Sequence, residues 1–182
     1  MWILVVLGVV VLLALALMGM YNGLVSLRNK VEAAWAQIEV QLKRRFDLIP
    51  NLVETVKGYA SHERETLDAV VRARQAAMSA TGPAQQAQAN NMITDALKSI
   101  FALAEAYPDL KANTNFLELQ EQLTATEDKV AYARQHYNDS VQKYNTKIQS
   151  FPQMFLARMA GFGPREYFEA DEASRGPVNV SF

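Results

Sequence analysis

The chain has 182 residues, half of them hydrophobic, and its formal net charge at pH 7 is −1. It contains no cysteine, which excludes disulfides, thiolate metal ligands, a cysteine nucleophile and a lipid attached through cysteine. A nucleic-acid-binding domain of this length would carry a clear excess of basic residues, so we expect no nucleic-acid partner.

The N-terminal segment predicts a membrane anchor. From Met1 to Leu27 no side chain is charged, and the stretch from Trp2 to Met20 is almost wholly aliphatic. About 20 apolar residues in a helix cross the hydrocarbon core of a bilayer. A cleaved signal peptide would begin with charged residues and have a small-residue cleavage site after its apolar core, and neither feature is found here. We therefore predict a transmembrane signal anchor over residues 1–21, with membrane lipid as a partner.

Charged residues around the anchor favour one orientation. Arg28 and Lys30 follow the apolar segment, whereas no lysine or arginine precedes it. Positive residues near a transmembrane helix tend to stay on the cytoplasmic side. The prediction is a single-pass protein of the cell membrane with a short external N-terminus and a cytoplasmic domain.

Apolar residues then recur at three- and four-residue steps, as on one face of a helix, in four segments. No glycine or proline lies between Leu24 and Phe46, so we expect the anchor helix to continue into the first bundle helix. The sequence "FDLIPN" predicts a tight turn over residues 45–51, because proline disfavours helical conformation in the residue before it. The second helix is expected from Pro50 to Met78.

Two further helices are expected after the second. The Gly82-Pro83 pair is a strong helix breaker and separates the second helix from the third. The third helix is predicted to end at Pro108. The fourth begins near Asn115, a candidate N-cap, and is interrupted at Pro152.

These segments predict the fold class. None alternates like a β-strand, so we expect an all-α, antiparallel four-helix bundle over residues 22–150, on a transmembrane helix that continues into its first helix. Residues 151–182 are expected to form a membrane-proximal, partly irregular tail, whose last dozen residues are extended or disordered. Alternating helix directions would place the corners at 45–51 and 107–114 far from the bilayer.

No motif in the sequence points to catalysis or metal binding. "HERET" at residues 62–66 resembles a zinc-protease helix, but Thr66 stands where the second histidine is required. The chain has two histidines and no cysteine, and it has no nucleophile elbow, phosphate loop or dinucleotide fingerprint. We expect no enzymatic activity, no cofactor and no metal.

The basic run "KRR" in the first bundle helix has two interpretations. Cations in the last turn of a helix complement its dipole and remain solvated. Alternatively, the run and the corner "YPDLKAN" form one exposed tip that docks a partner. The residues of this possible docking tip are Lys43, Arg44, Arg45, Phe46, Asp109 and Lys111.

Tyrosine-asparagine pairs recur at residues 137–138 and 144–145, one heptad apart. Tyrosines in such a stripe usually belong to the core, with hydroxyls that reach a partner or the surface. The alternative is a ligand pocket between the first and fourth helices, lined by Trp35, Tyr137 and Tyr144.

The tail begins with apolar aromatic residues close to one face of a short helix. One interpretation is an interfacial helix on the bilayer surface, and the other is a cap on the open end of the bundle. The residues of the possible membrane-surface contact are Phe151, Met154, Phe155, Arg158, Met159 and Phe162.

Two long stretches of the sequence resemble LemA family proteins, namely "YNGLVSLRNKVEAAWAQIEVQLKRRFDLIPNLVETVKGYASHE" and "AEAYPDLKANTNFLELQEQLTATEDKVAYARQHYNDSVQKYNTKIQSFP". The resemblance covers essentially the whole chain. It implies a four-helix bundle on a membrane anchor, a cytoplasmic soluble domain and a very short external N-terminus. It implies no catalytic residues.

Three functional hypotheses remain open. The first is a non-enzymatic scaffold that forms homo-oligomers, with close packing through alanines and glutamines around residues 84–91. The second is an adaptor that docks an unidentified membrane or cytoplasmic partner through the basic tip, for example in envelope stress or membrane quality control. The third is a small-molecule sensor that uses the tyrosine-lined pocket.

Overall fold

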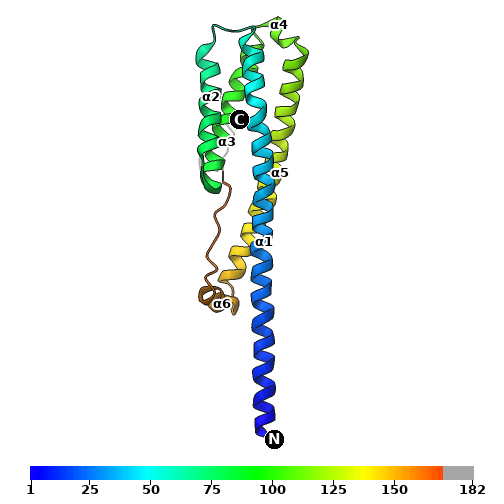
Figure 1. Ribbon diagram of the computed structural model, residues 1–182, viewed down its shortest axis with the longest axis vertical. Helices are drawn as coiled ribbons and strands as arrows, with labels where there is room; N and C mark the ends of the chain where they lie inside the picture. Colours follow the sequence, from blue (N-terminus) through cyan, green and yellow to red (C-terminus); the bar gives the residue numbers. More distant parts are fainter. Residues whose placement is uncertain (170–182) are drawn as a thin grey trace, which may run out of the picture. The chain divides into compact units, whose positions relative to one another are not determined.

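The computed structural model describes residues 1–169, and within that range it contains helices and no strand (Figure 1). This confirms the all-α class. The described residues form six helices, which are α1 Trp2–Lys57, α2 Arg64–Ser79, α3 Gly82–Ala104, α4 Pro108–Lys111, α5 Thr114–Gln149 and α6 Gln153–Met159. The predicted extended or disordered end of the tail lies outside the described residues.

The chain divides into two compact units. The anchor unit contains residues 1–36 and 135–166, and the bundle unit contains residues 37–134 with the segment that starts at Tyr167. The long helices α1 and α5 contribute to both units. Each unit has its own buried side chains and its own polar contacts.

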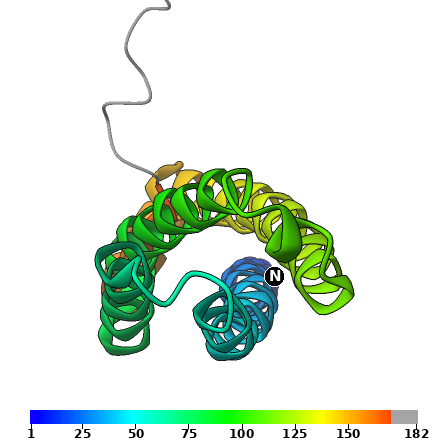
Figure 2. The same cartoon turned by 90° about the horizontal axis from the view of Figure 1, so that it is seen from above.

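The bundle unit is built from the second part of α1, then α2, α3, α4 and the first part of α5. Seen from above, α2, α3 and α5 curve around α1 (Figure 2). Contacts show that α1 and α5 are antiparallel neighbours, since Tyr59 just after α1 bonds Asn113 just before α5, whereas Arg45, earlier in α1, pairs with Glu127, later in α5. The fully buried aliphatic side chains of this unit include Ile38, Ile49, Leu52, Val56, Val70, Ile93, Ile100 and Leu110.

The predicted turn at residues 45–51 is wrong, because α1 runs through Pro50 and ends only at Lys57. A proline inside a helix leaves the carbonyl four residues earlier without its N–H donor. Here that carbonyl belongs to Phe46, and it accepts a hydrogen bond of 2.9 Å from Arg74 Nε of α2. The side chain of a neighbouring helix therefore replaces the missing backbone donor.

The observed starts of α2 and α5 differ from the predicted starts of the second and fourth helices. The first turn of the bundle unit lies between the end of α1 and Arg64, so the second helix starts well after its predicted start at Pro50. The cap of α5 is not Asn115, because the Asn113 Oδ1 accepts the Phe116 N–H at 3.0 Å. The predicted break at Gly82-Pro83 is confirmed, since Pro83 lies in the first turn of α3.

The anchor unit is built from the first part of α1, the end of α5, α6 and an extended segment after it. The N-terminal part of α1 is long and apolar enough to cross a membrane, and none of its most apolar stretch is buried. After Met20 the helix gains a buried face. The buried side chains of this unit include Leu24, Val31, Ala34, Tyr137, Val141, Tyr144 and Ile148.

Candidate functional site

The predicted docking tip does not form one surface. Successive residues of a helix point about 100° apart, and the three cations of "KRR" accordingly diverge. Lys43 lies at a groove beside α2, Arg44 lies at a groove beside α5, and Arg45 is fully buried. Asp109 and Lys111 belong to α4, and Lys111 pairs with Glu105 at the end of α3. The prediction is wrong for two of its residues, because Arg45 and Phe46 are buried and cannot lie exposed at a tip.

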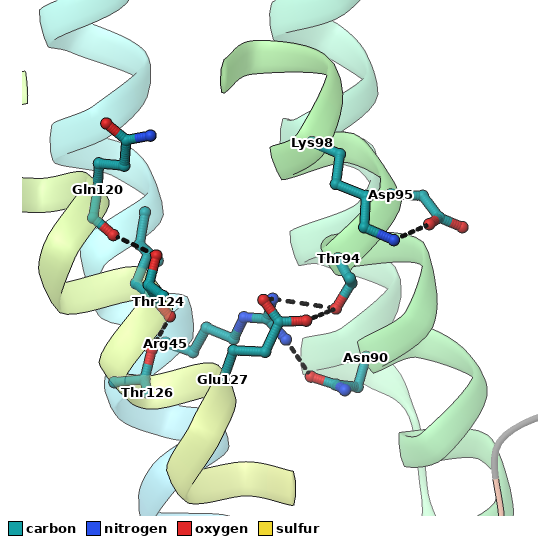
Figure 3. Close-up of polar contacts among 10 residues, drawn as sticks. Arg45, Asn90, Thr94, Asp95, Lys98, Gln120, Thr124, Thr126 and Glu127 are labelled. Carbon is teal, nitrogen blue, oxygen red and sulfur yellow. Dashed lines mark hydrogen bonds and ion pairs between the residues drawn. The ribbon is translucent and has the colours of Figure 1, made fainter. Parts of the chain in front are cut away.

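Arg45 is instead the centre of a polar cluster among three helices (Figure 3). Its Nη1 donates to Asn90 Oδ1 at 2.6 Å and its Nη2 donates to Thr94 Oγ1 at 3.0 Å, both on α3. Its Nη2 also lies 3.5 Å from Glu127 Oε2 on α5. Thr94 closes the cluster by donating to Glu127 Oε1 at 3.3 Å. We call Arg45, Asn90, Thr94 and Glu127 the Arg45 cluster.

The electrostatics of the Arg45 cluster follow from burial. The Arg45 side chain has no exposed surface, whereas 48% of the Glu127 side chain is exposed. Burial lowers the pKa of Arg45, and the charge of Glu127 acts in the opposite direction. The Nε–H has no hydrogen-bond partner among the described residues. The buried guanidinium of Arg45 contacts side chains of α3 and α5 and so links three helices. It is not available to bind a partner.

An apolar groove lies between α1 and the end of α2. It has a volume of about 330 Å³ and contains Leu42, Phe46 and Ala77, with Met78 at its edge. Phe46 is 9% exposed and forms part of the floor, whereas Met78 is 61% exposed. The rest of the lining is polar and consists of the charged residues Glu39, Lys43 and Asp47 of α1 and of Gln86 of α3. We call this feature the Met78 groove.

The tyrosine-asparagine pairs hold the chain's own extended segment. The hydroxyls of Tyr137 and Tyr144 donate to the backbone carbonyls of Glu166 and Gly163, at 2.9 and 3.0 Å. The Asn145 amide makes two bonds to the backbone of Arg165, donating to its carbonyl at 2.9 Å and accepting its N–H at 2.8 Å. We call these three side chains and residues 163–166 the tyrosine clasp.

The clasp occupies the region where the ligand pocket was predicted. Tyr137 and Tyr144 are 3% and 1% exposed, and the Trp35 ring packs against Tyr137 at a tilt, with ring centroids 5.4 Å apart. Burial raises the pKa of both tyrosine hydroxyls. These side chains line the bed of a peptide segment, so the structure gives the sensor hypothesis no support. The two tyrosine-asparagine pairs are seven residues apart, which places both tyrosines on one face of α5. This spacing was the sequence signal that they contact the same segment.

The clasp also connects to α1 through charge. The Arg165 Nη2 donates to Glu32 Oε1 at 3.0 Å, and the same carboxylate lies 4.0 Å from Arg28 Nε. Both arginines are part of the anchor unit. The sequence alone did not reveal the Arg165–Glu32 pair, because 133 residues separate its members.

The predicted membrane-surface residues divide into two groups. Phe162 is 9% exposed and packs against α1, with its ring 5.7 Å from that of Tyr21 and 5.4 Å from the Arg28 guanidinium. It therefore holds the tail on α1. The side chains of Phe151, Phe155 and Met159 are 79%, 56% and 87% exposed. Met154 is half-buried and Arg158 is exposed.

The "HERET" stretch has a structural partner that sequence reasoning missed. Glu63 Oε1 accepts a hydrogen bond of 2.9 Å from the Tyr107 hydroxyl. This bond to the carboxylate raises the pKa of Tyr107. Among residues 1–169, no group of three or more histidine, aspartate or glutamate side chains is arranged to hold a metal ion.

Comparison with known proteins identifies the family. The LemA family profile matches residues 34–182. Magnetosome protein MamQ 2 of Paramagnetospirillum magneticum is 27% identical over 199 residues, covering 95% of this chain and 73% of that protein. Protein LemA of Metamycoplasma hominis is 27% identical over 167 residues, covering 90% of this chain and 75% of that protein. This chain is thus a membrane-associated protein that belongs to the LemA family.

Proposed function

We propose that this protein is a non-enzymatic, single-pass membrane scaffold that acts by binding further copies of itself. The observation that carries the proposal is the Met78 groove, an apolar surface on the domain that follows the membrane anchor. Self-association through the residues around 84–91 has less support, because Ala87 and Ala89 are 1% and 5% exposed and belong to the core.

The Met78 groove has the composition of a protein-binding surface. An exposed methionine beside apolar side chains offers an adaptable contact, and fully buried anchors at the centre of an interface supply most of its affinity. The groove is flanked on α1 by Glu39, Lys43 and Asp47. Because this rim carries both charge signs, a second copy of the same surface can supply opposite charges to it.

The groups with shifted pKa values support a structural role over a catalytic one. They are Arg45, Tyr107, Tyr137 and Tyr144. Each donates a hydrogen bond to another part of the chain, at distances between 2.6 and 3.0 Å. Catalytic groups with perturbed pKa values are expected in a cleft that a substrate can enter. These four groups hold helices and the tail together.

The proposed orientation of the protein in the membrane rests on the basic residues beside the apolar segment. Arg28 and Lys30 lie on α1 just beyond its apolar segment. The positive-inside tendency therefore favours a cytoplasmic domain and an external N-terminus.

Photo-crosslinking in intact cells tests the scaffold. A photo-reactive residue at Met78 should give products at multiples of the 20.3 kDa chain mass. The matched control is the same residue at Tyr132, which is 76% exposed and is not part of the groove. Met78→Glu should remove the products formed through a second crosslinker at Lys43, because it places a charge on the apolar contact.

The possible outcomes separate the hypotheses. Multiples of the chain mass at Met78 but not at Tyr132 support self-association through the groove. A heavier product that contains a different protein supports the adaptor, with Lys43 and Phe46 still part of the docking surface. Monomer alone at Met78, together with a monomeric mass in detergent at every concentration, contradicts the scaffold.

A further inference from the structure

The strongest unexplained surface lies in the anchor unit, on α6 and the end of α5. Phe151 and Phe155 stack edge to face with centroids 6.1 Å apart, and both rings remain exposed. Met159 adds a third exposed apolar side chain. The opposite side of α6 is packed, because Ala157 is 1% exposed. Exposed apolar side chains that gather on and just before one short helix mark an interaction surface.

The position of α6 identifies what that partner is. Phe162, three residues after α6, packs on Tyr21 and Arg28 of α1. Tyr21 directly follows the apolar segment that ends at Met20. The tail is thus held at the level where α1 leaves the bilayer, and the tyrosine clasp fixes the residues after Phe162 to α5. Aromatic side chains at this depth favour the interfacial layer of a membrane.

The segment that leads into and follows α6 carries only basic charges, of which Arg165 is paired with Glu32 of α1. Between residues 140 and 165 the chain carries Lys143, Lys147, Arg158 and Arg165 and no acidic residue, although the net charge of the whole chain is −1. Lys143 and Lys147 line a shallow groove of about 600 Å³ between α1 and α5. Leu27, Gln142, Thr146 and Ser150 complete its lining. Ammonium, hydroxyl and amide groups together match the phosphate of a lipid headgroup.

We infer that α6 and the Lys143–Lys147 groove form a binding surface for anionic phospholipid. Phe151, Phe155 and Met159 enter the interfacial layer, and the two lysines bind the phosphates of lipids beside α1. This surface acts on each single copy of the chain and does not depend on self-association.

The absence of cysteine from the sequence makes a clean test possible. The full-length protein is placed at one copy per phospholipid nanodisc, with Phe155→Cys labelled by an environment-sensitive fluorophore. Nitroxide lipids labelled near the headgroup should quench this fluorophore. The matched control is His136→Cys, an exposed position next to Tyr137, whose ring contacts Trp35. Trp35 lies about 22 Å along α1 beyond Met20, at 1.5 Å per residue, so the control label is far from the bilayer. The control label should be quenched far less.

Lipid preference is measured with two tracers at equal mole fraction, nitroxide phosphatidylglycerol and nitroxide phosphatidylcholine. We expect the anionic tracer to quench the Phe155→Cys label several-fold more, since each lysine near an anionic surface strengthens binding about fivefold. Lys143→Gln with Lys147→Gln should bring the two tracers to equal quenching.

Two results overturn the inference. Equal quenching at positions 155 and 136 shows that α6 does not contact the membrane. Equal quenching of the Phe155→Cys label by both tracers, with Lys143 and Lys147 intact, shows that the protein does not select anionic lipid. Neither result bears on the scaffold, because a nanodisc with one copy contains no second chain.

Discussion

The two units each contain a polar cluster with buried members, and the clusters differ in chemistry. In the bundle unit, the Arg45 cluster joins a charged side chain to the side chains of Asn90, Thr94 and Glu127. In the anchor unit, the tyrosine clasp joins neutral side chains to backbone groups of residues 163–166. The first depends on the identity of every partner. In the second, the tyrosine and asparagine side chains contact only the backbone of the segment, and one exposed side-chain pair, Arg165–Glu32, adds to them.

This difference separates what holds the bundle together from what can be released. A buried charge that loses its partners is strongly destabilising, so the Arg45 cluster is expected to open only with its helices. A neutral hydrogen bond contributes about 0.5–1.5 kcal/mol net, and a segment held by a few such bonds can detach while the helices stay folded. The following predictions test that contrast, beginning with the largest expected effect.

Removing Arg45 should have the largest effect on the free energy of unfolding. Arg45→Ala empties a fully buried site and leaves Asn90 and Thr94 without their donor, so we expect a loss of about 3 kcal/mol. Arg45→Met keeps much of the volume and should lose clearly less. Chemical denaturation of the detergent-solubilised protein measures both values.

The neighbouring residue provides the control for this prediction. Arg44 is exposed and lies on the same helix, and Arg44→Ala should change the free energy of unfolding by less than about 0.5 kcal/mol. If Arg45→Ala and Arg44→Ala destabilise equally, the buried cluster has no special role.

A smaller effect is expected where a side chain bonds a backbone carbonyl in the bundle unit. Arg74→Ala removes the only described donor to the Phe46 carbonyl, which Pro50 leaves without its helical partner, and we expect a loss of about 1 kcal/mol. Pro50→Ala supplies the missing N–H. In that background, Arg74→Ala should have little effect on the same free energy.

A double-mutant cycle over these two positions gives their coupling energy. Arg72→Ala, at an exposed position of α2, is the control and should show no coupling to Pro50→Ala. Additive effects of Arg74→Ala and Pro50→Ala would show that the bond to the Phe46 carbonyl does not compensate for the proline.

The helical periodicity of the sequence predicted the fold class, but not the continuation through Pro50. The rule for proline is local, whereas the compensating donor, Arg74, lies 28 residues away. The role of Arg45 was missed because runs of cations are usually solvated. Its signal was the register, since Arg45 falls on the buried stripe of α1 that is formed by Ile38, Leu42, Ile49, Leu52 and Val56.

The site in the anchor unit was only partly predictable. The spacing of the tyrosine-asparagine pairs placed Tyr137 and Tyr144 on one face of a helix, and both are buried. Their partner could not be found, because the clasp bonds backbone carbonyls and one backbone N–H, which carry no sequence signal. The sequence left Phe162 open between a membrane contact and a cap, because its partner Tyr21 lies on a helix far away in the chain.

The smallest effect on the free energy of unfolding is expected when the tyrosine clasp is lost. The loss should release only residues 163–166, and it should depend on pH. The clasp needs protonated hydroxyls, because Tyr137 and Tyr144 donate to carbonyls. Burial raises the pKa of both. Their contribution is therefore fully present below the ordinary tyrosine pKa of about 10, and it is lost as the pH rises through the raised values.

We expect residues 163–166 to detach in alkaline solution before the helices unfold, because the tyrosines lose their neutral hydrogen bonds and the exposed Arg165–Glu32 pair holds the segment only weakly. A fluorophore on Glu166→Cys, whose side chain is exposed, reports the release, and circular dichroism reports the helices. With Tyr137→Phe and Tyr144→Phe together, the segment should be more mobile at neutral pH and show no alkaline transition. If that transition persists in the double variant, ionisation of these tyrosines does not cause the release, and the contrast between a fixed charged cluster and a releasable neutral one fails.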